Sequence, residues 1–285
     1  MLLSDISLAA LIVVSAVSFS TSAKDPVLVG AGDIASCTST NDEATARLLD
    51  DIPGTVFTAG DNAYVTTKKM RNPFRCYHAS WGRHKGRTRP TPGNHEYDGE
   101  YLDDYFDYFG SAAGDRDKGY YSYDLGKWHI IALNTMIDAG RTSPQGRWLS
   151  ADLAKNQRAC TLAYFHHPRF SSGPSPANKR AAQLWDVLSS AGADVVVSGH
   201  DHIYERFSPM SADGHRDERT GMRQFVVGTG GFSHYRIRRA ANYSEVRNDD
   251  TFGVLKLTLR ERGYDWQFVP VRGRHFTDAG SGACH

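Results

Sequence analysis

TVFTAGDNAY, residues 55–64, is an apolar run that stops at a glycine and is followed at once by a carboxylate, Asp61. Val, Phe and Thr favour extended backbone, so residues 55–59 are predicted to form a buried strand. An aspartate at the carboxyl end of such a strand is well placed to bridge two metal ions. The stretch therefore predicts an α/β fold with a metal site at one edge of a sheet.

Four other segments place metal-ligand side chains directly after strand-like runs: Gly32-Asp33, Gly93-Asn94-His95-Glu96, His166-His167-Pro168 and Gly199-His200-Asp201-His202. Each motif alone is a weak indication. The carboxyl ends of parallel strands meet at one edge of a sheet, however, so the motifs are expected to converge. Their oxygen and imidazole donors, without a thiolate, suit Fe, Zn or Mn. Together they predict a two-metal hydrolase of phosphate esters.

The composition favours one globular domain, residues 24–285. The chain has 285 residues, of which 40% are hydrophobic and 23% charged. Lys and Arg total 33 against 32 for Asp and Glu, so the net charge is +1 and gives no bulk attraction for nucleic acid or a membrane surface. The expected partner is a small phosphate ester, with no nucleic acid; the oligomeric state is left open.

A basic stretch at residues 68–89 is interleaved with Phe74, Tyr77 and Trp81. Basic and aromatic residues together can indicate binding of single-stranded nucleic acid. We favour a solvated helix whose aromatic side chains pack inward, because acidic residues elsewhere balance the charge. A third interpretation is that some of these cations attract phosphate toward the metals.

The first 23 residues predict a secretory signal peptide. Residues 6–19 are almost entirely apolar, and the small residues 20–23 that follow resemble a cleavage site ending at Ala23. The run is short for a membrane span, so a retained anchor is the less favoured alternative. Asp5 and the lack of Lys or Arg before the run are atypical. The mature protein is thus expected to be secreted or extracytoplasmic, without stable membrane association.

Export places the cysteines in an oxidising compartment, where an even number suggests disulfides. The residues are Cys37, Cys76, Cys160 and Cys284, and they allow three pairings. Cys37 and Cys76 each follow a metal-motif strand, so we expect Cys37 with Cys76 and Cys160 with Cys284. Reduced, buried thiols are the alternative.

Periodicity and capping residues predict the remaining elements. We expect strands at 27–31, 160–165 and 194–197, a hairpin at 120–125 and 128–133, and helices from Asp42, at 101–109, from Ser143-Pro144 to about Lys155, and at 177–190. The runs at 224–227, 253–259 and 264–271 are expected to close a second sheet as antiparallel strands. Residues 204–206 are interpreted as strand surface.

The spacing Asp61-x-x-Tyr64, with Gly93-Asn94-His95-Glu96 and the Gly-His-x-His motif at 199–202, resembles the purple acid phosphatases, which belong to the calcineurin-like metallophosphoesterases. The resemblance spans most of the chain after residue 24. It implies a sandwich of two mixed β-sheets flanked by helices, and a secreted phosphomonoesterase in which a metal-bound hydroxide attacks phosphorus.

The resemblance also implies roles for single residues. The first metal, ferric iron, would be held by Asp33, Asp61, Tyr64 and His202, and the second, an Fe, Zn or Mn ion bridged by Asp61, would also be held by Asn94, His166 and His200. His95 would lie beside the phosphate and stabilise the transition state or protonate the leaving oxygen.

Other residues are expected to support or contact the substrate. His166 is preferred to His167 as ligand because the family pattern is His-x-Pro, and Glu96 is expected to orient its neighbours. The family carries a further histidine or pair downstream of this motif, which this chain lacks at residues 171–176. Arg169, or a residue of the 232–235 loop such as His234, is expected to substitute.

Alternative functions remain open at this point. One is a phosphodiesterase of the same fold acting on nucleotides or lipid head groups, because the discriminating contacts lie in loops. The other is a catalytically inactive metal-binding module, which the full set of expected ligands and His95 disfavours.

Overall fold

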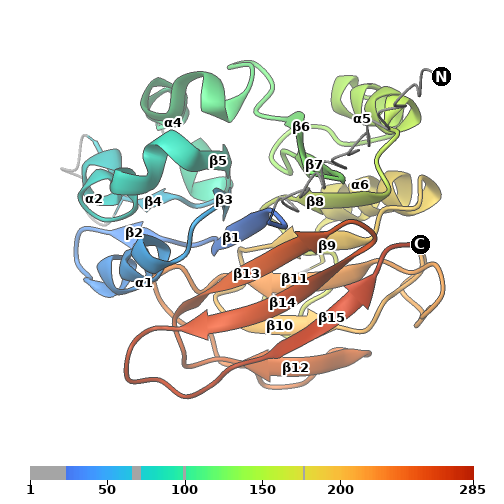
Figure 1. Ribbon diagram of the computed structural model, residues 1–285. Helices are drawn as coiled ribbons and strands as arrows, with labels where there is room; N and C mark the ends of the chain where they lie inside the picture. Colours follow the sequence, from blue (N-terminus) through green and yellow to red (C-terminus); the bar gives the residue numbers. More distant parts are fainter. Residues whose placement is uncertain (1–23, 66–71, 99–100, 176) are drawn as a thin grey trace, which may run out of the picture.

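The computed structural model describes residues 24–65, 72–98, 101–175 and 177–285. The expected signal peptide at residues 1–23 lies outside the described residues. Within them, the strands form two large mixed sheets that face each other, with helices outside (Figure 1). This confirms the expected α/β sandwich. No helix in the described part of the chain is long and apolar enough to cross a bilayer.

The first sheet is built around the strand that carries Asp61. Its strands run in the order β15 (Ala279–Ala283), β14 (Gly263–Pro270), β13 (Gly253–Arg260), β1 (Val27–Ala31), β3 (Thr55–Ala59) and β5 (Thr88–Thr91). β1, β3 and β5 are parallel, so their carboxyl ends share one edge. A short parallel pair, β2 (Ala35–Ser36) and β4 (Ala63–Tyr64), extends that edge.

The second sheet carries the histidine motifs. Its order is β12 (Ser244–Asn248), β10 (Tyr204–Phe207), β11 (Arg223–Val227), β9 (Val195–Ser198), β8 (Cys160–Tyr164), β7 (Trp128–Ala132) and β6 (Tyr121–Leu125). β7, β8, β9 and β11 are parallel, and β6 and β7 form the predicted hairpin, with Leu125 opposite Trp128.

The helices connect the strands and cover the outer faces. They are α1 (Asn41–Asp51), α2 (Phe74–Ala79), η1 (Trp81–Arg87), α3 (Asn94–Tyr97), α4 (Leu102–Phe109), η2 (Gly110–Ala113), α5 (Pro144–Lys155) and α6 (Lys179–Ser190). Ser143 caps α5 by accepting from the Gly146 backbone N–H at 3.0 Å, as predicted. α6 begins at Lys179 rather than 177, because the Asn178 side chain caps its first turn.

The main core lies between the sheets and is largely aromatic. Rings from the first sheet meet rings from the second in pairs, with centroids 4.5–5.8 Å apart: Phe57 with Tyr164, Trp128 with Tyr264, and Tyr204 with Phe268. Burying each such side chain contributes about 1.5–3 kcal/mol. A second cluster packs α5 and α6 against the outer face of the second sheet. The sheets are therefore fixed relative to each other, and so are the strand ends.

The late strands differ from the prediction. They do not form a sheet of their own: β13 pairs antiparallel with β1, whereas β11 pairs parallel with β9. β1 and β9 would otherwise expose an unpaired edge, and the later strands cover it on each sheet. The prediction for residues 204–206 was also wrong, because Tyr204 and Glu205 are fully buried. β10 lies inside its sheet, between β11 and β12, and the backbone N–H of Ser172, in a loop, donates to Glu205 at 2.7 Å.

The described part of the basic stretch is helical, as favoured. Phe74, Tyr77 and Trp81 are buried. Arg83 donates to Glu43 at 2.7 Å and to Asp50 at 2.8 Å, so its charge is neutralised within the fold. Residues 66–71 lie outside the described residues.

The cysteines pair as expected. Cys37 bonds to Cys76 and Cys160 bonds to Cys284, with Cα–Cα distances of 5.4 and 5.5 Å. The second bond fastens the end of β15 to the start of β8 and so holds the last strand on the first sheet.

Candidate metal centre

The motif residues meet where the strands of both sheets end. Asp33 follows β1, Asp61 follows β3, and Asn94 opens α3 just after β5. From the second sheet, His166 follows β8, and both His200 and His202 follow β9. The structure thus brings together every residue that the sequence predicts as a ligand, drawn from both sheets.

The backbone at this edge is held in an unusual conformation. Asp33, Asp61 and His200 have φ angles of 61°, 50° and 70°, the left-handed region that non-glycine residues rarely occupy. Each such residue costs on the order of 1 kcal/mol and persists where the surroundings enforce it. Here the His200 N–H donates to the Asp33 carboxylate at 2.8 Å, and the Asp33 N–H to the Gly60 carbonyl at 3.1 Å. Strain of this kind clusters at functional sites.

One donor cluster surrounds the Tyr64 hydroxyl. The Tyr64 oxygen lies 2.8 Å from Asp33 Oδ1, 3.0 Å from Asp61 Oδ2 and 3.2 Å from His202 Nε2. Burial and the two carboxylates raise the pKa of Tyr64 well above its usual value. A single hydroxyl proton cannot serve three acceptors at once, so the cluster has more lone pairs than protons.

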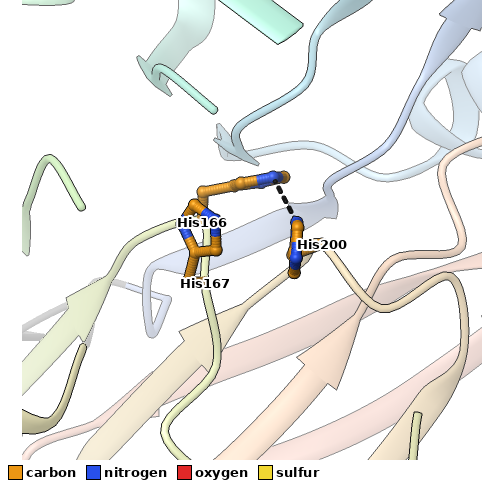
Figure 2. Close-up of side chains that lie close together, drawn as sticks. All are labelled: His166, His167 and His200. Carbon is orange, nitrogen blue, oxygen red and sulfur yellow. Dashed lines mark hydrogen bonds between the residues drawn. The ribbon is translucent and has the colours of Figure 1, made fainter. Parts of the chain in front are cut away.

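A second donor cluster lies around Asn94. Its side-chain oxygen is 2.9 Å from His166 Nε2 and 2.9 Å from His200 Nδ1, and these nitrogens are 3.2 Å apart (Figure 2). Nδ1 of His166 lies 2.8 Å from the Ala59 carbonyl, which only an N–H can satisfy. In the neutral ring Nε2 then carries the free lone pair, as in a metal-ligating histidine.

Asp61 joins the two clusters. Its Oδ2 atom is 3.0 Å from the Tyr64 hydroxyl and 3.3 Å from His166 Nε2. Burial alone would raise the pKa of Asp61, but the neighbouring His166 outweighs it and the pKa is lowered. Burial lowers the pKa of His166, and the Asp61 carboxylate reverses this and raises it to about 9. The site therefore carries concentrated negative charge that favours a cation.

The residues present fit metal ions. Asp33 and Asp61 are 0% and 2% exposed, and in the described residues their ion-pair partners are imidazoles rather than Lys or Arg. Two buried carboxylates are costly without a second cationic partner beside the protonated His166. Bound cations would supply that partner, and the mixed donors, carboxylate, phenol, amide and imidazole, suit Fe, Zn or Mn.

Glycines let the ligands approach this closely. A Cβ atom on Gly60, whose φ is +80°, would lie 2.6–2.7 Å from the His166 ring. A Cβ atom on Gly93 would lie 2.2 Å from Asp61 Oδ1. Both contacts are far below van der Waals distance, which explains why glycine precedes Asp61 and Asn94.

His95 lies beside the clusters but remains accessible. Its side chain is 38% exposed, and its Nε2 atom is 4.0 Å from Asp61 Oδ2. The His95 backbone N–H donates to Asp61 Oδ1 at 2.8 Å. The His95 ring packs against Tyr64 with ring centroids 4.4 Å apart, and Tyr64 also stacks on Phe232 with centroids 3.5 Å apart. A group in this position can reach both solvent and a molecule bound at the centre.

Glu96 organises the loops after β3 and β5. Its buried carboxylate accepts from the backbone N–H groups of Gly93, Asp61 and Asn62 at 2.6, 3.0 and 2.7 Å. Burial and the Asp61 carboxylate raise the pKa of Glu96 to about 7. Through these contacts Glu96 fixes the backbone on which Asp61 and Asn94 lie, which is consistent with its predicted role of orienting its neighbours.

His167, which the sequence predicts as a supporting residue rather than a ligand, lies beside the ligand histidines. Its Nδ1 atom is 2.8 Å from the Thr135 hydroxyl, and its ring centroid is 4.2 Å from that of His200. Burial and the neighbouring imidazoles lower its pKa to about 2, so the ring is neutral. Figure 2 shows it grouped with His166 and His200, and one nitrogen of each lies within 4.8 Å of the others. The structure thus groups His167 with the two histidines that the sequence predicts as ligands of the second metal.

The 232–235 loop contributes residues that the motifs did not single out. The Ser233 hydroxyl oxygen lies 2.7 Å from His202 Nδ1. The Tyr235 ring stacks on the His202 ring with centroids 4.0 Å apart. His234 stacks on Phe252 with ring centroids 3.9 Å apart, and its Nδ1 atom lies 3.4 Å from the His202 carbonyl oxygen. The sequence predicts a substrate contact from this loop, but no strand-end motif indicates that it packs on His202.

A cavity of about 330 Å³ opens beside the second cluster, lined in part by His200, Asp201 and Arg169. Nε of Arg169 is buried without a hydrogen-bond partner among the described residues. Asp201 is fully buried and its Oδ2 also lacks a described partner. Arg169, predicted as a substrate residue, thus lines a cavity beside the second cluster, together with Asp201, for which the sequence predicts no separate role.

Comparison with known sequences decides the family. Residues 26–204 match the profile described as Calcineurin-like phosphoesterase. The chain belongs to this family. This calcineurin-like phosphoesterase is 30% identical over 155 residues to Purple acid phosphatase 18 of Arabidopsis thaliana, covering 50% of the chain and 35% of that protein. It is 27% identical over 254 residues to Phosphoenolpyruvate phosphatase of Allium cepa, covering 74% of the chain and 51% of that protein.

Solved structures agree on the fold of this calcineurin-like phosphoesterase. Purple acid phosphatase PPD1 from yellow lupin (Lupinus luteus) superimposes with a TM-score of 0.69 at 19% identity, over 92% of the chain and 54% of that protein. GAP50 of Plasmodium gives 0.69 at 15% identity, over 92% and 90%. The chain spans about half or less of the length of the curated relatives described above. The resemblance to purple acid phosphatases is confirmed.

Proposed function

We propose that this protein is a metal-dependent phosphatase that hydrolyses small phosphate monoesters with two metal ions. The observation that carries the proposal is the position of Asp61, whose carboxylate contacts both donor clusters. The names of the similar proteins, which are phosphatases, support the reaction class.

We assign the ligands by cluster. One metal, ferric iron, would be held by Asp33, Asp61, Tyr64 and His202, and the other, Fe, Zn or Mn, would be held by Asp61, Asn94, His166 and His200, whose side chains contact one another in two clusters. Bound metal ions acidify water and neutralise the charge that develops on phosphoryl oxygens.

The remaining residues position these groups and handle the proton. Hydrolysis of a monoester leaves an alkoxide that needs a proton, and a positioned histidine is a suitable donor near neutral pH. His95 is the exposed imidazole beside Asp61, so we assign it this role. Glu96 holds the Asp61 and Asn94 loops at fixed separation through its backbone contacts.

We further propose that the protein works outside the cytoplasm, with residues 1–23 as a signal peptide and 24–285 as one catalytic domain. Paired cysteines support an oxidising compartment, because cytosolic thiols are normally kept reduced.

The test combines metal analysis with a pair of substrates. Purified protein is analysed for Fe, Zn and Mn, and then assayed with p-nitrophenyl phosphate and bis(p-nitrophenyl) phosphate. We expect metal in both positions and a clear preference for the monoester. A strong preference for the diester would show that the protein is a phosphodiesterase and would overturn the monoesterase assignment. Bound metal without turnover of either ester, at any pH or added metal, would indicate an inactive module.

A further inference from the structure

A hollow lined by arginines borders the candidate metal centre on the side of His202. This basic hollow has a volume of about 680 Å³ and is lined by Ser172, His234, Tyr235, Arg236, Arg238 and Arg239, among others. Its inner wall includes Tyr235, whose ring stacks on His202 at a centroid distance of 4.0 Å. A molecule in the basic hollow therefore lies next to the metal ligands.

The arginines give the basic hollow an uncompensated positive charge. Arg236 lies 3.5 Å from Asp249, so its charge is partly neutralised. Arg238 and Arg239 are exposed and have no ion-pair partner in the part of the chain that the structure describes. The whole chain has a net charge of only +1, so a local group of free cations stands out against a balanced surface.

The loop that carries these arginines is fixed to the centre. The Tyr235 N–H donates to the His202 carbonyl at 3.2 Å, and the Ile237 N–H to Asp249 Oδ2 at 2.9 Å. The Ala241 N–H donates to the Ser172 hydroxyl at 2.7 Å, and the buried Glu205 carboxylate accepts from that same serine. The arginines therefore extend from a backbone whose place relative to His202 is set.

We propose that the basic hollow binds a second phosphate group of the substrate, so that the preferred substrates are small molecules with a phosphate in addition to the one that is cleaved. This inference rests on the proposed phosphatase function. Guanidinium groups bind phosphate through paired, charge-assisted hydrogen bonds. Binding a remote group of the substrate can be used to accelerate the reaction at the centre.

The test uses glucose 1,6-bisphosphate and glucose 6-phosphate, which differ by one phosphate. Initial phosphate release is measured at fixed ionic strength for the natural chain and for the double variant Arg238→Gln/Arg239→Gln. We expect the variant to lose about tenfold in kcat/KM on the bisphosphate, equivalent to about 1.4 kcal/mol. On the monophosphate it should stay within about twofold, as for loss of exposed charge.

The matched control is the double variant Lys127→Gln/Arg262→Gln. It removes the same charge from exposed turns, between β6 and β7 and between β13 and β14, at the end where β1 begins. It should leave both substrates unchanged. An equal loss on both substrates in the Arg238/Arg239 variant, or a similar loss in the control, would overturn the subsite.

A binding measurement separates this proposal from the proposed function. If neither sugar phosphate nor p-nitrophenyl phosphate is hydrolysed, the phosphatase assignment fails, but calorimetric titration with glucose 1,6-bisphosphate still tests the basic hollow. A Kd about tenfold weaker in the arginine variant supports the subsite. An unchanged Kd excludes it.

Discussion

Asp61 is the single side chain on which the centre depends. Its Oδ1 accepts from the His95 N–H at 2.8 Å, while Oδ2 contacts both Tyr64 and His166. Asp61→Asn keeps the shape and tolerates the left-handed backbone, but removes the charge. We expect kcat/KM to fall by more than about 1,000-fold and the bound metal content to fall. Mutation of residues that only hydrogen-bond to metal ligands already lowers metal affinity or activity by roughly 10–100-fold. Metal analysis and phosphate release on the folded variant check this.

His95→Gln is the companion variant. It should retain the metal content of the natural chain and lower kcat by about 100- to 10,000-fold, the usual contribution of a general acid. If it lost metal as Asp61→Asn does, His95 would be a ligand rather than a proton donor.

Tyr64 tests the identity of the first metal. Tyr64→Phe removes the oxygen that lies 2.8 Å from Asp33 but keeps the ring that stacks on Phe232. If ferric iron is bound there, the natural protein should show a broad visible absorption band and the variant should lose it. The circular dichroism spectrum should not change. A band that survives the substitution would place the iron away from Tyr64.

The sequence predicts the individual site residues that end strands, whereas for the 232–235 loop it predicts a substrate contact and not the packing on His202. Asp33 and Asp61 could be found because an apolar run delivers each of them to the sheet edge. Ser233 and Tyr235 reach His202 from a loop 31 to 33 positions later, and no local pattern encodes that contact. Asp201 is fully buried, and one of its contacts is with the 171–175 loop, through the Ser175 N–H. The sequence around Asp201 does not indicate this burial, because it depends on how that loop packs.

Among the elements, the β6–β7 hairpin is joined to α5 by a charged bridge centred on His129. Its Nδ1 and Nε2 atoms lie 3.0 Å from Asp124 and 2.8 Å from Asp152. Burial lowers the pKa of His129, but the hydrogen bonds to Asp152 and Asp124 outweigh it and raise the pKa above 6.5. Only the protonated ring can donate to both carboxylates at once.

This bridge predicts a stability that depends on pH. Because the folded pKa is raised, the stabilisation is complete below the unfolded pKa near 6.5 and is lost as the pH rises through the folded pKa. His129→Gln should therefore lower the free energy of unfolding by about 1–2 kcal/mol more at low than at high pH. Urea unfolding on each side of this range measures the difference. Ser122→Ala removes a hydrogen bond to Asp152 whose donor, a hydroxyl, does not titrate in this range, so it should cost the same at both pH values.

Elements with local signals were predictable, and those without were not. α5 could be placed from Ser143-Pro144 because the cap and the proline act within one turn. β15 has the sequence AGSGA, with no apolar alternation, and exists because β14 pairs with it. The placing of β13 beside β1 likewise depends on which strand edge is open, which is a property of the assembled sheet.

On the scale of the whole molecule, the disulfides close loops of different length. Cys160 and Cys284 are 124 positions apart, whereas Cys37 and Cys76 are 39 apart. A longer closed loop restricts the unfolded chain more, so opening the Cys160–Cys284 bond should cost about 1 kcal/mol more than opening the Cys37–Cys76 bond. Paired Cys→Ala variants of each bridge, compared by denaturant unfolding, test the ranking. Equal losses would mean that local packing, rather than chain entropy, sets the contribution.

The ligands come from both sheets, and this has a consequence beyond catalysis. Asp33 and Asp61 end strands of one sheet, while His166 and His200 end strands of the other. Metal ions bound between these ligands would connect the two sheets. A free metal concentration of 100 times Kd would add about 2.7 kcal/mol to the free energy of unfolding. Stripping the ions should speed amide hydrogen exchange at the ends of β1, β3, β8 and β9 together. Metal supply would then govern how long the protein survives as well as how fast it works.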